Sequence, residues 1–228
     1  MTEAIDDYLK TIYELEEDGG RASTASIAKH LEIAPASVTG MLKKLSEKDQ
    51  PWIAYEKHQG AKLTGRGRKR ALEIIRHHRL LEKFLHDSLG YRWDEVHDEA
   101  EKLEHAISER FEDRIAEQLG DPIEDPHGHL IPRKDGTIPE RSQQGLLELP
   151  VGYSALVLCV SDRDPEILRY LSSLGIRPGV GLRLVEKGPF DGPLMLQVGS
   201  DEKVHALGVK VCAEIQVTMS TKDGSADD

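Results

Sequence analysis

The sequence predicts an α+β fold that is mostly helical and ends in a small β domain. Three observations predict it. Through most of residues 3–119, hydrophobic residues recur with the 3.6-residue period of a helix, with one strand-like interruption. Residues 120–150 are rich in Pro, Gly and Asp, which is typical of a connection with little structure of its own. From Tyr153 onward the pattern changes to short apolar runs, which indicate strands.

The N-terminal segment predicts three short helices. Residues 3–18 carry one apolar stripe, and a second helix covers about 24–31, with Ser23 or Thr24 available as its N-cap. After a short break, Pro35 is well placed in the first turn of the third helix. The stripe of the first helix consists of Ile5, Tyr8, Leu9, Ile12 and Leu15. Two short helices with a tight break between them predict a helix-turn-helix.

A two-stranded hairpin follows the third helix. Residues 52–55 are strand-like, residues 58–61 form a turn, and the chain returns at 62–63. The pattern therefore predicts a winged helix-turn-helix. Its candidate DNA-binding residues are Ser37, Thr39, Lys43 and Lys44 on the third helix and Lys57, His58 and Lys62 on the wing. We expect Ser37 and Thr39 to approach base edges and the basic side chains to contact phosphates. The alternative is that these residues form solvated surfaces of the helix and the hairpin and contact no DNA.

The charge of the chain is distributed unevenly. Its formal net charge is −11, which alone argues against nucleic acid as a partner. Residues 20–70, however, contain eleven Lys or Arg and four Asp or Glu, so this segment carries +7 and the rest of the chain −18. A basic module joined to an acidic body is typical of a DNA-binding domain with a separate sensing domain.

Two long helices are predicted next. Thr64 can cap a helix that runs to about Leu89, and Asp94 can cap another over 95–119, closed by Gly120. Their apolar positions suit a helical pair that also dimerises. These positions are Leu72, Ile75, Leu80, Phe84, Val96, Leu103, Ile107 and Ile115.

The C-terminal part predicts a small β-barrel-like domain. Strands are expected over 155–160, 181–185, 194–198 and 209–218, with a short helix at 165–174. We therefore divide the chain into a DNA-binding domain at 1–70, a helical dimerisation and metal-binding domain at 71–140, a linker at 141–150, a β domain at 151–220 and a disordered tail at 221–228.

The densest pattern of metal-binding side chains lies in the second long helix. His97, Glu101, Glu104 and His105 stand at i, i+4, i+7 and i+8, which places them along one helical face. His78 and Glu82 are four residues apart on the preceding helix. Two antiparallel helices that present imidazoles and carboxylates to each other make a divalent metal site. A solvated acidic face is the alternative, and we expect His77, Asp98 and Glu99 to belong to such a surface.

These residues carry a resemblance to a known family. The chain resembles the diphtheria toxin repressor family in four features. These are the start Asp7-Tyr8-Leu9 with Ile12-Tyr13-Glu14-Leu15, the winged helix, the pair His78 and Glu82, and the run from His97 to His105. The resemblance covers essentially the whole chain. It implies an SH3-like third domain, a homodimer and a metal-activated repressor that binds palindromic double-stranded DNA, with two dimers on one operator as a further option.

The resemblance also implies two metal sites, and hence one or two ions per subunit. The primary site would use Asp7, Glu101, Glu104 and His105. The ancillary site would use His78, Glu82 and His97, completed by an acid of the third domain. The family's Glu-x-x-Gln ligands are not visible in this domain, and Asp162 and Asp164 are weak candidates.

The implied primary ligands favour Mn(II) over Fe(II), although both stay open as the cofactor. The iron-dependent branch has Met and Cys where this chain has Asp7 and Glu101, as the manganese branch does, and hard carboxylates suit Mn(II). Lys10 departs from the manganese branch, which has a second N-terminal carboxylate there. The chain thus resembles a hybrid, with iron-regulator architecture and a manganese-like primary site.

Two other function classes fit parts of the pattern. The His/Glu cluster could activate water in a metallohydrolase, or the helices could be the scaffold of a winged-helix regulator that senses an organic ligand. We expect no enzyme, since no nucleophile or lid is visible. Cys159 and Cys212 cannot form a disulfide framework, so we expect a cytoplasmic protein, and no apolar run approaches the roughly 20 residues of a membrane span.

Overall fold

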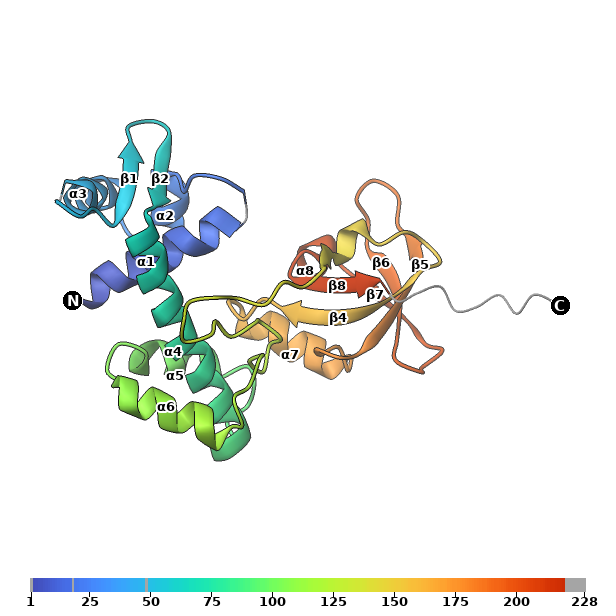
Figure 1. Ribbon diagram of the computed structural model, residues 1–228. Coiled ribbons are helices and arrows are strands. Elements are labelled where there is room, and N and C mark those ends of the chain that lie inside the picture. The colour runs from blue at the N-terminus through green and yellow to red at the C-terminus, as the bar shows by residue number, and fades with distance from the viewer. Residues whose placement is uncertain (1, 18, 48, 220–228) are drawn as a thin grey trace. The chain divides into compact units, whose positions relative to one another are not determined.

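The computed structural model describes residues 2–17, 19–47 and 49–219 (Figure 1). The described chain forms two compact units. The first unit contains the chain up to His78 together with residues 102–112 and 132–138. The second contains residues 79–101, 113–131 and the chain from Pro139 onward. The predicted tail at 221–228 lies outside the described residues. None of the helices in the described part has the length and hydrophobicity to cross a bilayer.

The N-terminal part of the first unit is a winged helix-turn-helix, as predicted. Its elements are α1 (Glu3–Glu17), α2 (Thr24–His30), α3 (Pro35–Ser46), β1 (Ile53–Glu56) and β2 (Gly60–Leu63). Ser23 caps α2, because its hydroxyl accepts a hydrogen bond from the Ser26 amide at 2.9 Å. The strands β1 and β2 are antiparallel, with Ile53 opposite Leu63, and Figure 1 shows this hairpin rising beside α3.

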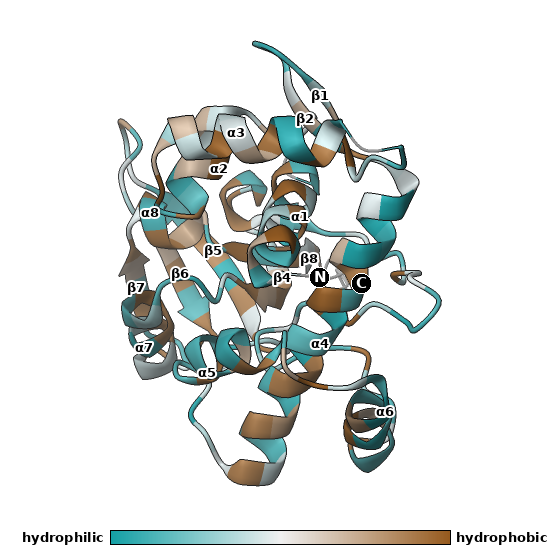
Figure 2. Ribbon diagram, turned by 90° about the vertical axis from the view of Figure 1, so that its left-hand side faces the viewer, coloured by the Kyte–Doolittle hydropathy of each residue, from teal (hydrophilic) through white to brown (hydrophobic). Residues whose placement is uncertain are grey.

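One apolar core holds these elements together. Leu9, Ile12, Ile27, Leu42 and Ile53 are each at most 1% exposed and come from four different elements, α1, α2, α3 and β1. Burying such a side chain contributes roughly 1.5–3 kcal/mol. Along α3, hydrophobic residues alternate with hydrophilic ones (Figure 2), so the helix keeps one face for the core and another for solvent.

The long helix α4 (Gly65–Leu89) begins in the first unit and continues into the second. Thr64 caps it as predicted, since its hydroxyl accepts a hydrogen bond from the Gly67 amide at 3.1 Å. Gly67 is required here, because a Cβ at this position would lie 2.0 Å from the carbonyl oxygen of Trp52. The start of α4 is thereby packed closely against the wing.

The single helix predicted over 95–119 is wrong. The chain forms α5 (Val96–Leu103) and α6 (Glu109–Gln118) with a break between them. One long-range and one local interaction account for the break. The carbonyl oxygen of Glu104 accepts a hydrogen bond from His77 Nδ1 at 3.1 Å instead of one from a backbone amide of a continued helix. The Ser108 hydroxyl accepts a hydrogen bond from the Phe111 amide at 3.3 Å, and α6 begins there.

Residues 120–150 have more structure than their composition suggests. The predicted linker at 141–150 contains β3 (Gln144–Gly145) and the short 3-10 helix η1 (Leu146–Glu148), and Leu146 and Leu149 are fully buried in the second unit. Upstream, Gly128 lies against β4 (Ser154–Val160): its φ is +87°, and a Cβ would meet the Leu158 carbonyl oxygen at 2.0 Å. The segment therefore belongs to a packed fold, and its Gly and Pro residues define its backbone conformation rather than make it flexible.

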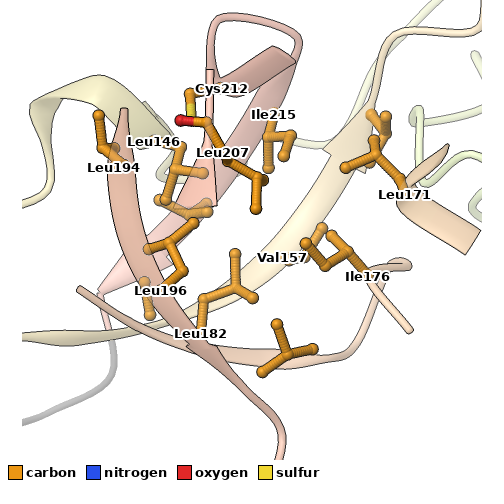
Figure 3. Packing of buried hydrophobic residues seen from close by; sticks show 14 of the residues in the cluster. Leu146, Val157, Leu171, Ile176, Leu182, Leu194, Leu196, Leu207, Cys212 and Ile215 are labelled. Carbon is orange, nitrogen blue, oxygen red and sulfur yellow. The ribbon is translucent and has the colours of Figure 1, made fainter. Parts of the chain in front are cut away.

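The C-terminal part of the second unit is the predicted SH3-like β domain. Its six-stranded antiparallel sheet has the order β3-β8-β4-β5-β6-β7. Besides β3 and β4 these strands are β5 (Gly181–Lys187), β6 (Leu194–Val198), β7 (Val204–Leu207) and β8 (Ile215–Met219), with α7 (Pro165–Ser173) and α8 (Val209–Cys212) between them. Figure 3 shows Leu146, Val157, Leu171, Leu196 and Ile215 gathered in its core.

Two expectations about this domain need correction. The predicted strand at 209–218 is the short helix α8 followed by β8, since Gly208 ends the extended chain and its carbonyl oxygen accepts a hydrogen bond from the Cys212 amide at 3.0 Å. The strand β7 was not predicted, because its residues Val204–Leu207 alternate too briefly to show a strand pattern.

Candidate metal centres and nucleic-acid interface

A group of three metal-binding side chains lies in the first unit. Asp7 comes from α1, whereas Glu104 and His105 come from the break after α5, and one donor atom of each lies within 4.8 Å of the others. His105 Nε2 is 2.9 Å from Asp7 Oδ1 and 3.5 Å from Glu104 Oε1. Two carboxylates and one imidazole form a donor set that suits a divalent first-row ion.

Two further side chains meet at Glu104. Lys10 Nζ lies 2.9 Å from Glu104 Oε2 and 3.1 Å from His78 Nδ1, and His78 Nδ1 lies 2.5 Å from the same Oε2. Burial alone would raise the pKa of Glu104, but His78 and Lys10 outweigh it and hold this pKa below its ordinary value. Glu104 is therefore a buried carboxylate that keeps its charge.

The other two ligands of this group differ in their surroundings. Burial raises the pKa of Asp7, and the nearby Glu104 carboxylate adds to the rise against the opposing effect of His105. His105 turns its Nδ1 away, toward Asp6 Oδ2 at 3.9 Å. Asp6 is held in place by Arg70, whose two nitrogens each donate a hydrogen bond of 2.8 Å to its carboxylate. His105 Nδ1 is buried and makes no hydrogen bond with the described residues, so Asp6 acts on this ring through its charge.

A second group of donors lies in the second unit. Glu82 of α4, His97 of α5 and Asp162 after β4 each bring one donor atom within 4.8 Å of the others. His97 Nδ1 lies 3.4 Å from Glu82 Oε1 and 3.4 Å from Asp162 Oδ2. The acid of the third domain that lies here is thus Asp162. Asp164 instead caps α7, where it accepts hydrogen bonds from the amides of Glu166 and Ile167.

Three donors of the same unit come from a segment that the sequence pattern did not single out. Asp125, His127 and His129 form a group whose donor atoms lie within 4.8 Å of one another. His127 is fully buried and its Nδ1 lies 3.7 Å from Glu82 Oε1. The alternation Asp-x-His-x-His is visible in the sequence, but it lies in a stretch rich in Pro, Gly and Asp, where no helical spacing indicates a shared face.

The surroundings of His127 fit a metal ion. Its Nε2 donates a hydrogen bond of 2.6 Å to the Trp93 carbonyl oxygen, which leaves the lone pair of the neutral ring on Nδ1. That Nδ1 is buried and has no hydrogen-bond partner among the described residues. Asp125 Oδ2 makes no hydrogen bond either, and its contacts are the ion pairs with His129 Nδ1 at 3.3 Å and Arg79 Nε at 3.8 Å. Buried polar atoms without hydrogen bonds are rare in folded proteins, and a bound cation would satisfy both.

Opposite charges dominate the second group. Although burial disfavours an imidazolium, Asp162 and Glu82 outweigh it and raise the pKa of His97 to about 11. Against the same burial, Glu82 above all raises the pKa of His127 to about 10. The hydrogen bond from His97 overcomes burial and holds the pKa of Asp162 well below its ordinary value. Without metal, protons on the two histidines balance the charge of the acids.

The structure separates one predicted ligand from its group. Glu101 lies in the second unit, its side chain is 56% exposed, and its Oε1 is 3.6 Å from His97 Nε2. The face expected to align Glu101 with Glu104 and His105 is interrupted, because α5 ends at Leu103. His78 and Glu82 do lie one turn apart on α4, as expected.

His77 is not the surface residue that we expected. It is 4% exposed, and its Nε2 lies 3.2 Å from Glu112 Oε2 while its Nδ1 meets the Glu104 carbonyl oxygen. Both partners are acceptors, so both ring nitrogens donate. Against the effect of burial, Glu112 raises the pKa of His77, and the ring holds the backbone of the Glu104 loop.

The predicted DNA-binding residues gather around α3 and the wing. Lys43 and Lys44 are exposed on α3, and so are Lys57, His58 and Lys62 on the hairpin. Ser37 is exposed as well, whereas Thr39 is half-buried and its hydroxyl donates a hydrogen bond of 3.0 Å to the Pro35 carbonyl oxygen. Between α3 and the wing lies a groove of about 430 Å³, lined among others by Ser23, Thr39, Lys43 and Lys57.

Comparison with known proteins decides the family. Residues 1–61 match the N-terminal DNA-binding domain of iron-dependent repressors, 64–133 match their metal-binding and dimerisation domain, and 145–219 match the FeoA domain. The iron-dependent repressor IdeR of Mycobacterium tuberculosis is 31% identical over 231 residues, which cover 92% of this chain and 99% of that protein. The chain belongs to the diphtheria toxin repressor family.

Other members of this family of metal-dependent transcriptional repressors are similar along all or nearly all of their length. The diphtheria toxin repressor of Corynebacterium jeikeium is 31% identical over 229 residues, or 89% of this chain and 95% of that protein. A solved structure of a manganese-dependent transcriptional repressor in complex with manganese is 38% identical, covers 95% of this chain and 100% of its own, and has a TM-score of 0.89. Family membership thus supports a repressor over a metallohydrolase or an organic-ligand sensor.

Proposed function

We propose that this repressor is a cytoplasmic homodimer that binds palindromic operators of metal-homeostasis genes when Mn(II) is abundant, with Fe(II) as the second candidate ion. The observation that carries the proposal is the contact of Asp7 with His105. Asp7 lies on the first helix of the winged helix-turn-helix, and His105 lies in the segment between α5 and α6. If metal strengthens this contact, it restrains the DNA-binding module, and DNA binding then depends on metal.

The donor atoms of the first group support Mn(II). Asp7, Glu104 and His105 offer oxygen and nitrogen only. Cys159 and Cys212 are buried, and burial raises the pKa of each thiol to about 11, so neither is prepared to act as a thiolate ligand. Hard oxygen donors suit Mn(II), which does not compete well for soft ligands. The manganese-bound relative supports the same choice.

The switch follows from the arrangement of these residues. A bound ion would supply bonds that join Asp7 to Glu104 and His105. Without that link, α1 is joined to the loop by the contacts of Asp7 with His105 and of Lys10 with Glu104, while the like charges of Asp7 and Glu104 oppose them. With it, α1 is restrained, and so are the helices that pack on it. An ion shifts this balance only by its preference for the restrained state.

The second group acts as a separate centre in the proposal. Glu82, His97 and Asp162 would hold one ion, together with donors from Asp125 and His127. This set draws on α4, α5, the 123–131 segment and the loop after β4, so it would stabilise the second unit. We therefore propose two centres in each subunit. His78, the remaining residue of the expected ancillary site, contacts Glu104 and Lys10 of the first group.

On the DNA side, α3 would enter the major groove and the wing would lie along the backbone. Ser37 and Thr39 would approach base edges, while Lys43 and Lys44, with Lys57, His58 and Lys62, would contact phosphates. In a dimer, two recognition helices about 34 Å apart would fit one face of a palindrome. Two dimers on one operator stay part of the proposal.

A titration of chelated protein on labelled palindromic DNA tests the function. Fluorescence anisotropy would be followed with no metal, with Mn(II), with Fe(II) under anaerobic conditions, and with Mg(II) as the control ion. The proposal predicts specific binding with Mn(II) or Fe(II) and only weak, salt-sensitive binding with Mg(II). Specific binding of the same strength in chelator would contradict it.

A further inference from the structure

Gly40 lies in the middle of α3, the proposed recognition helix, where a glycine is unfavourable for stability. The helix spans Pro35–Ser46 without interruption. Glycine loses more backbone freedom on folding than alanine and has no side chain to pack. At an exposed position inside a helix it raises the equilibrium constant of unfolding roughly two- to fivefold relative to alanine. Such a glycine is explained by close packing within the fold or by the close approach of a ligand.

Packing within the protein does not require Gly40. The position is exposed, and beyond the local helix backbone a Cβ there would meet no heavy atom of the described residues within 4 Å. Gly67 in α4 is the opposite case, since its Cβ would lie 2.0 Å from the Trp52 carbonyl oxygen. The fold therefore has room for alanine at position 40, and alanine would stabilise the helix.

Gly40 lies at the centre of the proposed DNA-binding face of α3. Ser37 precedes it by three residues, and Lys43 and Lys44 follow it by three and four, so these side chains share its face of the helix. The buried residues of α3 occupy the opposite face and pack in the core of the first unit. The glycine thus removes the side chain at the place where the helix would meet DNA.

The side chains beside Gly40 differ in how closely they need the helix to approach DNA. Ser37 is short, so its hydroxyl can reach a base edge only if the backbone of α3 lies near that edge. The Thr39 hydroxyl donates its hydrogen bond to the Pro35 carbonyl oxygen at 3.0 Å, which holds this side chain against its own helix. Lys43 has a long flexible side chain, so it can reach a phosphate from a shallow or a deep position of the helix.

We propose that Gly40 is a specificity-determining residue of the repressor. Its missing side chain lets the backbone of α3 lie against the base edges in the major groove, at the depth that Ser37 needs for its own contact. The proposal rests on the proposed DNA interface and adds that the depth of insertion, besides hydrogen bonding, selects the operator. Non-specific binding depends on phosphate contacts and does not need this depth. A methyl group at position 40 therefore weakens operator binding and leaves non-specific binding unchanged.

Two substitutions that favour a helix test the proposal. Gly40→Ala adds one methyl group, and Gly40→Leu adds a larger side chain. Gly65→Ala is the control, because Gly65 is an exposed glycine at the start of α4 whose Cβ would also meet nothing within 4 Å among the described residues. Urea unfolding of the metal-free protein measures stability. Fluorescence anisotropy in saturating Mn(II) measures binding to a palindromic duplex that the parent has selected from a random library, and to a scrambled duplex of the same composition.

The proposal predicts opposite effects of Gly40→Ala on stability and on specific binding. The unfolding constant should fall roughly two- to fivefold, the ordinary gain of alanine over glycine in a helix. Affinity for the selected duplex should fall roughly tenfold, as for a lost base contact, and further in Gly40→Leu, with binding to the scrambled duplex unchanged. Gly65→Ala should bind both duplexes like the parent.

Two results for Gly40→Ala would overturn the proposal. One is an affinity for the selected duplex equal to that of the parent, which would show that a side chain at position 40 meets no DNA. The other is a stability below that of the parent, which would show that the fold itself requires the glycine. If the parent selects no duplex in Mn(II), the proposed DNA-binding function fails, whatever the Gly40 variants do.

Discussion

His105 Nε2 lies 2.9 Å from Oδ1 of Asp7, and this contact joins the first helix of the DNA-binding module to the loop between α5 and α6. Both residues belong to the first unit, so the contact is part of one compact body. It is also short enough that an ion held by these side chains would replace a direct hydrogen bond.

Asp6 is expected to support the metal ligand His105. In Asp6→Asn the charge facing Arg70 and His105 Nδ1 is lost, which leaves the partly buried guanidinium of Arg70 with Glu73 as its remaining acid. We expect a loss of about 2–3 kcal/mol in the free energy of unfolding of the metal-free protein. We also expect Mn(II) affinity to fall roughly tenfold, because the charge of Asp6 behind the His105 ring is lost.

Glu73→Gln is the control for Asp6. It removes the other acid that contacts Arg70, at 2.6 Å, but Glu73 is 36% exposed and lies away from His105. Calorimetric titration with Mn(II) and urea unfolding measure both properties. Equal Mn(II) affinities in the two variants would show that Asp6 does not act on His105.

Metal binding at the second group should release protons. The pKa of His97 is about 11 and that of His127 about 10 in the metal-free protein, so both rings carry protons at neutral pH that a metal must displace. We expect Mn(II) affinity to rise with pH between 6 and 9. Calorimetry in two buffers of different ionisation enthalpy counts the released protons, and His97→Gln should release fewer.

The same raised pKa values determine how the free energy of unfolding of the metal-free protein depends on pH. The pKa of His97 in the folded protein lies above the unfolded value of 6.5, so its ion pairs contribute fully below pH 6.5 and are lost as pH rises toward 11. Without metal, the free energy of unfolding of the parent should therefore fall toward that of His97→Gln as the solution becomes alkaline. A constant difference between the two proteins up to pH 11 would contradict the ion pairs described here.

Glu101 is the predicted ligand that belongs to the second unit, where its side chain is 56% exposed, and Glu101→Cys tests whether it binds metal at all. A thiolate in place of a carboxylate should shift the ranking of activating ions toward Fe(II), Co(II) or Zn(II) relative to Mn(II). Metal-dependent operator binding measures the ranking. If the order of ions stays as in the parent, Glu101 is no ligand and its contact with His97 is only an ion pair.

Lys43 is expected to contact a phosphate. It is exposed on α3 and lines the groove beside the wing. In Lys43→Ala, operator affinity should fall, and the slope of log affinity against log salt should become shallower by about 1. Lys210→Ala is the control, since that lysine is 82% exposed on α8 in the other unit. An unchanged slope would mean that Lys43 is merely solvated.

The sequence predicted the fold well wherever residue period and capping agreed. The helices of the first unit, the wing and β6 follow the pattern of buried and exposed residues closely. The break at Glu104 could not be predicted this way, because helical period is preserved across it. It depends on His77, whose partners Glu104 and Glu112 come from distant parts of the chain.

The candidate site was predictable in part for the same reason. Helical spacing singled out His78 with Glu82 and the residues from His97 to His105, since i and i+4 positions share a face. It could not find His127, because nothing in a Pro- and Gly-rich stretch indicates burial. The close packing of Gly128 on β4 and the hydrogen bonds of His127 with Val160 and Trp93 together place that imidazole beside Glu82.

The most direct measurement of the switch compares operator affinity with and without saturating Mn(II) in the parent, Asp7→Ala and Glu3→Ala. Glu3 is an exposed acid in the first turn of α1 and controls for a simple effect on the helix dipole. In the parent and in Glu3→Ala, Mn(II) should raise affinity by roughly 5- to 150-fold, the usual range of such coupling. In Asp7→Ala the ratio should fall close to one, while weak binding at low salt survives. An undiminished ratio in Asp7→Ala would contradict the proposal that the contact between Asp7 and His105 converts metal binding into DNA binding.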